Sequence, residues 1–200
     1  MNRLLPFACL AACLSACDGP IDPPPDVPSP DGSARGFRRM DIDQIDASLR
    51  VATGVTWTEV VDGETVSLFE KLQLTLGKPD FKAATEEDLA PGLLFQKFLD
   101  DAANAVCTEV VNRERFGGGA RYLLQASTMT DTPATAAGAI DADLARAVLV
   151  FHGRTVTPGD AEHARWRWLF DAVLADTGET TTAWRAVCVA LITHPAFYAY

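Results

Sequence analysis

Positive charge is scarce in this sequence. Its 17 Lys and Arg side chains stand against 27 Asp and Glu side chains, which gives a net charge of −10 over 200 residues. A protein with this excess of acid repels the phosphate backbone, so we expect no nucleic-acid partner. The same charge gives no attraction to an anionic lipid surface, so any membrane attachment must come from another feature.

Most short motifs that carry chemistry are also missing. The sequence has no Cys-x-x-Cys-His segment for covalent haem, no Gly-x-Ser-x-Gly nucleophile turn and no phosphate-binding loop. The three histidines, His152, His163 and His194, have no spacing that lets two of them bind zinc from one helix. We therefore expect no catalytic residue, no cofactor and no metal, and we interpret each histidine as a helix-end or surface residue.

The apolar run at the start is too short to span a membrane. Residues 4–14, LLPFACLAACL, fall well below the roughly 20 residues of a transmembrane helix, but they fit the apolar centre of a signal peptide. The tetrapeptide Leu14-Ser15-Ala16-Cys17 follows and resembles the lipobox of bacterial lipoproteins. In that family the cysteine thiol receives a diacylglyceryl group and the chain is cut before the cysteine.

The lipobox resemblance implies a location. Residues 1–16 are then a signal peptide, and Cys17 carries palmitate-like acyl chains that anchor the protein in a membrane of the cell envelope, on its periplasmic or outer side. Each buried CH₂ of an acyl chain contributes about 0.8 kcal/mol, so two or three chains form a stable anchor. Two alternatives stay open: an ordinary signal peptide cut near Ala16, or an uncleaved apolar end.

A proline-rich segment separates the anchor from the rest. Six of the nineteen residues 18–36 are proline, with Asp, Gly and Ser between them, and no apolar periodicity is present. This composition predicts a tether that is partly extended as polyproline II, and simple disorder is equally compatible with it. We assign residues 17–36 to the lipidated cysteine and tether, and residues 37–200 to the folded domain.

Helical periodicity dominates the folded part and predicts a mainly α-helical, single compact domain of about five to six helices. A helix is expected after Asp41, ending at Gly54, and a hairpin or a loop is expected near residues 57–66 around Asp62-Gly63. Residues 128–138 read as irregular. Further helices are expected at about residues 67–76, 93–112, 141–152, 158–176 and 180–193, with a helix entry near residue 85.

Two cysteines of the mature chain lie within these helices. Cys107 and Cys188 each occupy the middle of an expected amphipathic helix. The space beyond the inner membrane is oxidising, so we predict a disulfide between them. Two buried free thiols are the alternative, since free cysteine is a common core residue.

Aromatic side chains concentrate near the C-terminus. Trp166 and Trp168 are two residues apart, so one helix face cannot bury both. If Trp166 is buried, Trp168 lies nearer the surface, and with Tyr198 and Tyr200 it forms or borders a patch that docks a partner, because exposed tryptophan is enriched at binding hot spots. In the alternative, the tail folds back over Trp168 and completes the core.

A second resemblance involves two C-terminal segments, residues 149–158 (LVFHGRTVTP) and residues 183–198 (AWRAVCVALITHPAFY). They resemble helical domains of large planctomycete and myxobacterial proteins that are associated with cytochrome c. Those domains carry an Arg-Pro-Val-Thr turn, where this chain has Thr155 in place of proline. The resemblance implies an α-helical fold, and this chain lacks the haem module of such proteins.

Two functional hypotheses follow. In the first, the lipid-anchored domain is a non-catalytic module that binds an envelope protein partner. In the second, it is an accessory component of a redox or hydrolytic envelope system, with a site of dispersed residues near His152 and Arg154. A pocket that holds both residues with an acid would favour the second hypothesis, and an apolar surface would favour the first.

Overall fold

The computed structural model describes residues 38–78, 89, 91–117 and 119–200. Within these residues it has seven helices and one two-stranded antiparallel sheet, so the fold is mainly helical, as the sequence predicts. The expected signal peptide, Cys17 and the tether lie outside the described residues, and so does the helix entry expected near residue 85.

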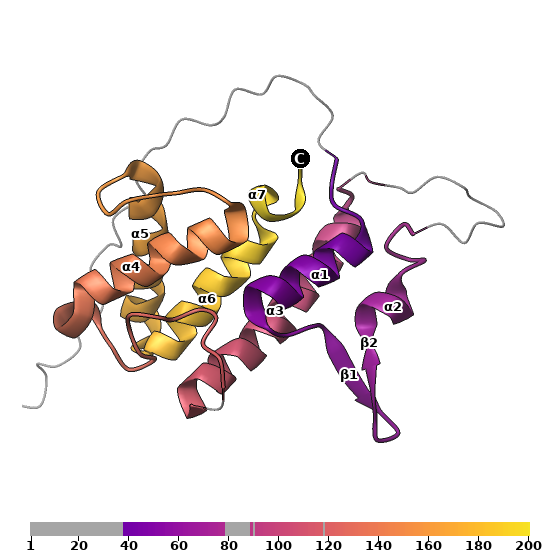
Figure 1. Ribbon diagram of the computed structural model, residues 1–200, viewed down its shortest axis with the longest axis horizontal. Helices are drawn as coiled ribbons and strands as arrows, with labels where there is room; N and C mark the ends of the chain where they lie inside the picture. The colour runs from indigo at the N-terminus through magenta and orange to yellow at the C-terminus, as the bar shows by residue number, and fades with distance from the viewer. Residues whose placement is uncertain (1–37, 79–88, 90, 118) are drawn as a thin grey trace, which may run out of the picture.

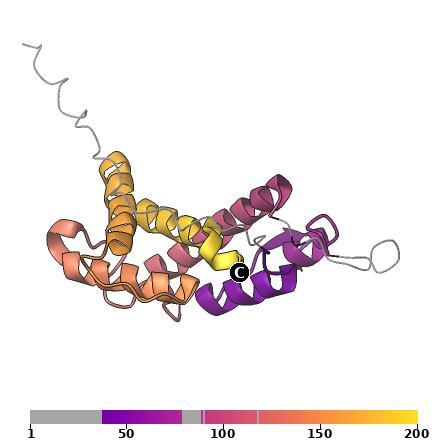
Figure 2. The same cartoon turned by 90° about the horizontal axis from the view of Figure 1, so that it is seen from above.

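Helix α6 (Thr180–Thr193) lies at the centre, with α3 (Leu93–Phe116) and α5 (Ala161–Thr177) packed against it. Helix α4 (Pro133–His152) contacts both α5 and α6. At the other end of the molecule lie α1 (Ile42–Thr53), the strands β1 (Thr58–Val61) and β2 (Glu64–Ser67), and α2 (Leu68–Leu72), as Figure 1 shows. Seen from above, α1 and α4 lie end to end along one side, with α3 and α6 behind them (Figure 2).

The start of the domain folds as its sequence predicts. Asp41 caps α1 by accepting the backbone N–H of Gln44 at 2.7 Å, and the Gln44 side chain accepts the N–H of Asp41 in return. Gly54 ends the helix with φ of 67°. The hairpin, one of two possibilities for the next residues, is present: Asp62 and Gly63 both take positive φ in its two-residue turn.

The boundaries of α4 and α5 differ from those expected. Helix α4 begins at Pro133, inside the segment that reads as irregular, because Thr132 and Thr135 form a capping box and the helix tolerates a kink at Ala136. Helix α5 begins at Ala161, three residues after the expected start near residue 158. Asp160 occupies the cap position and its carboxylate accepts the N–H and hydroxyl of Thr157, both at 2.8 Å, which closes the turn before the helix.

The core is tied together by a disulfide between α3 and α6. Cys107 and Cys188 are bonded, with 5.8 Å between their Cα atoms, so the predicted pairing is confirmed. Both residues are fully buried, and Trp184 lies fully buried one turn before Cys188. Closing this loop of the chain restricts the unfolded state, which stabilises the fold.

The described residues between α3 and α4, 117 and 119–132, form no helix or strand, and two carboxylates bind the middle of this segment. Glu114 of α3 accepts the backbone N–H groups of residues 122, 123 and 124. Asp143 of α4 accepts those of residues 125, 126 and 127, and also the Ser127 hydroxyl. Backbone donors that would otherwise lack a partner are thus satisfied by side chains from two flanking helices.

The two ends of the described domain pair with each other. Arg38 and Tyr200 exchange backbone hydrogen bonds, and the N–H of Met40 donates to the carbonyl of Tyr198 at 2.6 Å. Between them Arg39 is buried, with its guanidinium 4.6 Å from the centre of the Phe95 ring and bonded to the Leu76 carbonyl. The C-terminal tail therefore pairs with the first described residues of the domain.

Candidate functional site

A groove of about 440 Å³ lies where α1, the end of α4 and the short helix α7 (Pro195–Tyr198) meet. Each of these elements supplies part of the wall. The side chains that matter most below are Ala47 and Val51 from α1, Val150 and His152 from α4, and Ala196 and Phe197 from α7.

The helical periodicity of α1 explains its contribution. Its residues 42, 45, 49 and 52 are buried in the core, so residues 47 and 51, which are four apart, share a face away from it. Val51 is 81% exposed on this face, and across the groove Val150 of α4 is 40% exposed. The groove is therefore bordered by apolar side chains that the fold itself leaves in water.

A second hollow of about 330 Å³ adjoins the groove and shares Ala47 and Val51 with it. Its lining contains three acids, Asp43, Asp46 and Glu70, and one base, Arg50. Arg50 pairs with Asp46 at 2.6 Å, and Lys78 pairs with Asp43 at 2.8 Å. The three acids and these two bases together leave one excess negative charge on this surface. Helix α1 therefore has the apolar groove on one side and the acidic hollow on the other.

His152, at one end of the groove, completes the last turn of α6. Its Nε2–H lies 2.9 Å from the carbonyl oxygen of Leu191. In a continuous helix this carbonyl would accept the N–H of residue 195, but residue 195 is proline and has no N–H. The bond leaves Nδ1 of His152 as the unprotonated ring nitrogen, and this atom is buried without a hydrogen-bond partner among the described residues.

His194 packs beside His152 at the junction of α6 and α7. The two ring centres are 4.8 Å apart, and both rings contact Trp166 of α5, at 5.5 and 6.0 Å. Nδ1 of His194 accepts the N–H of Ala196 at 3.1 Å and so caps α7. Three segments that are distant in the sequence therefore bring two neutral imidazole rings together.

The surroundings lower the pKa of both imidazoles. Burial is the largest cause of the lowered pKa of His152. The hydrogen bond to Leu191 acts in the opposite direction and raises this pKa, and the nearby positive charge of Arg154 lowers it further. Partial burial is also the largest cause of the lowered pKa of His194, followed by repulsion from His152. Each group therefore resists protonation in the fold, since a buried cation costs more than a solvated one.

Arg154 does not join His152 in the groove. Its guanidinium pairs with Glu162 of α5 at 2.6 Å, and its side chain is 55% exposed. The groove that holds His152 is lined by neither Arg154 nor a carboxylate. The combination that would favour an enzymatic site at this position is thus not formed in the described part of the chain.

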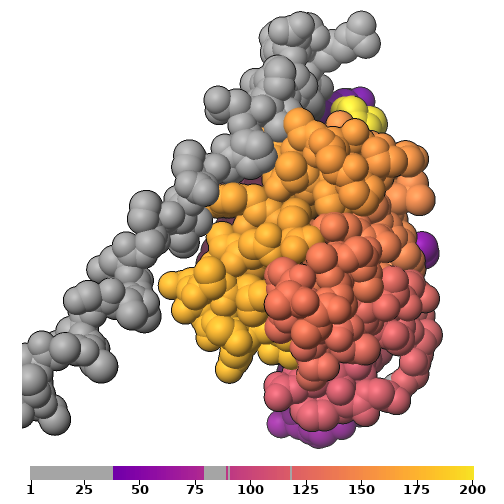
Figure 3. Space-filling model, turned by 90° about the vertical axis from the view of Figure 1, so that its left-hand side faces the viewer, coloured from indigo at the N-terminus to yellow at the C-terminus, as the bar shows by residue number. Residues whose placement is uncertain are grey.

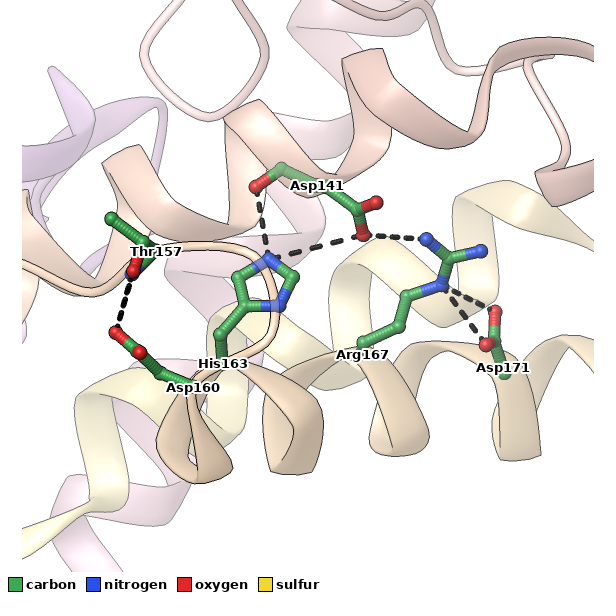
Figure 4. Close-up of polar contacts among 6 residues, drawn as sticks. All are labelled: Asp141, Thr157, Asp160, His163, Arg167 and Asp171. Carbon is green, nitrogen blue, oxygen red and sulfur yellow. Dashed lines mark hydrogen bonds and ion pairs between the residues drawn. The ribbon is translucent and has the colours of Figure 1, made fainter.

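A separate polar cluster joins α4 to α5 (Figure 4). His163, which is buried rather than on the surface, bonds through Nε2 to the carbonyl of Asp141 at 3.1 Å. Arg167 contacts the carboxylates of Asp141, at 2.5 Å, and Asp171, at 2.9 Å. Burial on its own lowers the pKa of Arg167, but the bonds to the two carboxylates outweigh it and raise that pKa. The cluster therefore fastens two helices that form one continuous face of the molecule (Figure 3).

The three aromatic docking candidates have different environments. Tyr198 is 5% exposed, its ring lies 5.3 Å from that of Phe95, and its hydroxyl accepts the Gln96 amide, so it offers almost no exposed ring to a docking patch. The tail folds onto α3 because this buries a large ring. Trp168 is half-buried and Tyr200 is 70% exposed. Docking by these two residues stays a prediction, and Trp166 is buried as expected.

Two further properties concern the described residues alone. None of their His, Cys, Asp and Glu side chains form a group of three that could hold a metal ion. None of their helices has the length and apolar character needed to cross a membrane.

Sequence reasoning missed the groove and the histidine pair. Both depend on contacts between α1, α4, α6 and α7, which no local pattern encodes. One signal was present: the His194-Pro195 step predicts a helix end, and a proline four residues after Leu191 predicts a carbonyl that needs a donor from elsewhere.

Comparison with known proteins adds no relative. The sequence matches no family model, and no curated protein and no solved structure is significantly similar to the chain.

Proposed function

We propose that this protein is a lipid-anchored component of a bacterial cell envelope that acts by binding a partner protein. Cys17 carries the lipid, residues 18–36 form the tether, and the helical domain presents the groove between α1, α4 and α7. The anchor is supported by the apolar run and the Leu14-Ser15-Ala16-Cys17 motif that follows it.

The exposed apolar rim of the groove carries the binding proposal. Val51 and Val150 remain 81% and 40% exposed although the domain buries a large core elsewhere. Contiguous apolar surface that surrounds a concavity is typical of protein interaction sites, because a partner gains free energy by removing it from water. The groove is open to such a partner along the outer face of α1.

The neighbouring hollow indicates the chemistry of that partner. Asp43, Asp46 and Glu70 lie beside the groove on the same surface of the domain, and the chain as a whole carries a charge of −10. A partner segment with apolar side chains for the groove and a basic side chain for the hollow fits both features. Complementary charge of this kind would steer the encounter and fix the register of binding.

The second hypothesis receives less support. An accessory role in a redox or hydrolytic system is compatible with the resemblance of the C-terminal segments to cytochrome-c-associated domains. A site built from His152 and Arg154 is less compatible with the geometry, because Arg154 pairs with Glu162 and His152 bonds to the Leu191 carbonyl. We therefore place the binding function first.

Site-specific photo-cross-linking in intact cells tests the groove. A benzophenone side chain at position 51 should give a protein adduct, and peptide mapping should place it in a segment with apolar and basic residues. Position 60 is the matched control, because Val60 is also a highly exposed valine, at 73%, and lies outside the groove. Position 168 tests the aromatic alternative.

The outcomes separate the surfaces. An adduct from position 51, lost on Glu70→Lys and absent at position 60, supports the proposal. Equal adducts at positions 51 and 60, or an adduct only at position 168, would contradict docking in the groove. An adduct with a second copy of this chain would contradict a separate partner and show that the groove mediates self-association.

A further inference from the structure

We propose that His152 and His194 form an acid-sensitive latch that holds α7 as a wall of the groove, so that acidification opens the groove and releases its partner. Release of a partner from the groove depends on the proposed function, whereas the acid-sensitive opening of α7 does not. Its parts are the α4 end that carries His152, the α6–α7 junction that carries His194, and the two wall residues Ala196 and Phe197.

Each histidine holds its part only in the neutral form. Nδ1 of His194 accepts the N–H of Ala196, and a proton on that nitrogen would replace the acceptor by a second donor facing the first. The cap of α7 would be lost. Nδ1 of His152 is buried without a partner among the described residues, so a proton there would be a buried, unsatisfied donor on a cation.

The two protonations also oppose each other. The rings are 4.8 Å apart, so two imidazolium cations would repel across a partly buried contact. Arg154 and Arg165 face the pair from the α4–α5 loop and from α5 and add positive charge, while Glu162 of α5 opposes them. The α1 residues of the groove, among them Ser48 and Val51, add no charge.

The direction of the pH effect follows from these contacts. Both groups have a lowered pKa in the closed fold, so the open state binds more protons below about pH 6.5, the ordinary value for histidine. The closed state is therefore fully favoured above that value, and it loses its advantage as the pH falls towards the lowered pKa values. Trp166 contacts both rings and would lose those contacts when the junction opens.

Opening would act directly on the groove. Helix α7 has four residues, and its ring contact with α4 is that of Phe197 with Phe151, at 6.0 Å between centres. Besides its cap, the segment is held by the backbone bonds of Phe197 to His194 and of Ala199 to Pro195. At its far end the Tyr198 carbonyl accepts the Met40 N–H, and the Tyr198 ring packs on Phe95 of α3. Loss of the cap therefore loosens the first turn of α7, where Ala196 and Phe197 form one wall of the groove, without dismantling α3 or α6.

Hydrogen exchange of the full-length protein between pH 7.5 and 5.0 tests the latch. The protection factors of the Phe197 and Ala199 amides should fall at low pH, by about tenfold for each unit by which the closed fold lowers the pKa of His152 or His194. Those of Val106 and Val110 in α3 should stay constant. The double variant His152→Gln and His194→Asn keeps a donor to Leu191 and an acceptor for Ala196 but cannot titrate, so it should abolish the fall. His163→Gln, which changes the third histidine, should retain it.

Three results would overturn the latch. They are constant protection of α7 over this range, a loss that persists in the double variant, and a loss shared equally by α3. Cross-linking from position 51 at both pH values then tests regulation of the groove. A yield that falls at pH 5.0 in the protein with both histidines, but not in the double variant, supports regulation. An unchanged yield at pH 5.0, in a protein whose α7 amides have lost protection, contradicts it. Because exchange needs no partner, failure of the groove as a docking site leaves the test of the latch intact.

Discussion

Glu114 and Asp143 divide six consecutive backbone N–H groups between them, three each, from residue 122 to residue 127. The two acids belong to α3 and α4, so a segment without regular structure is fixed to both helices. Asp143 is itself buried, at 1% exposure, and its second oxygen also accepts the Ser127 hydroxyl. Side-chain bonds to its backbone, above all those of these two acids, therefore fix the shape of this segment.

Removing the buried carboxylate should destabilise the whole domain. Asp143→Ala leaves three N–H groups and one hydroxyl without their acceptor, so the free energy of unfolding should fall by about 3 kcal/mol in a denaturant titration. Asp131→Ala is the control, because Asp131 accepts one exposed N–H, that of Thr128, and should cost less than about 1 kcal/mol. Equal losses in the two variants would contradict the role given to Asp143.

The glycine that ends α1 should tolerate alanine less than the glycine that ends α4. Gly54 and Gly153 both end a helix with positive φ, 67° and 64°, so alanine strains the backbone by about 1 kcal/mol at each. At Gly54 the added Cβ would also lie 2.4 Å from the Tyr122 ring, whereas at Gly153 it would meet nothing within 4 Å. Thermal unfolding should show the larger loss for Gly54→Ala, and equal losses would rule out the contact with Tyr122.

The disulfide should carry a large share of the stability. The bond between Cys107 and Cys188 spans a sequence separation of 81 residues, and restricting a loop of this size is worth about 4 kcal/mol. The Cys107→Ala, Cys188→Ala double variant should lose about this much. In the unmodified protein, alkylation without reductant should label neither residue after denaturation; two labelled thiols would show that the bond does not form.

Asp160 should titrate below an ordinary aspartate. The N–H of Thr157 is the largest cause of its lowered pKa, and the Thr157 hydroxyl is the second. The stabilising effect of this turn is therefore present above pH 3.8 and is lost as the pH falls through the lowered pKa. In an NMR titration of the carboxyl carbon, Thr157→Ala should move the pKa part of the way back, because the backbone donor remains. A pKa unchanged by this substitution would contradict the contact.

Local patterns predicted the parts of the fold that local bonds build. Asp41 and Gly54 mark both ends of α1, and Asp62-Gly63 marks the hairpin, because these residues favour the backbone shapes found there. The start of α4 was missed since Thr132 and Thr135 form their capping box within a Thr- and Ala-rich stretch without apolar periodicity.

The candidate site was less accessible to sequence reasoning. His152 was singled out, but with Arg154, the charged neighbour two residues away, whereas its contacts in the fold are Leu191, His194 and Trp166. Tyr198 was expected to form or border a docking patch with Trp168 and Tyr200, whereas in the fold its ring packs against Phe95 of α3. Both differences concern which distant segments meet, and that is decided by the packing of whole helices.

The lipid anchor is the claim on which the envelope role depends, and intact-mass spectrometry of the full-length chain made in a bacterial host tests it most directly. We expect a mature protein that begins at Cys17 and carries the mass of a diacylglyceryl group with or without a further acyl chain. Cys17→Ser should give an uncut chain without the mass of the lipid. A mature protein that begins elsewhere, or an unmodified Cys17 in the membrane fraction, would contradict the account.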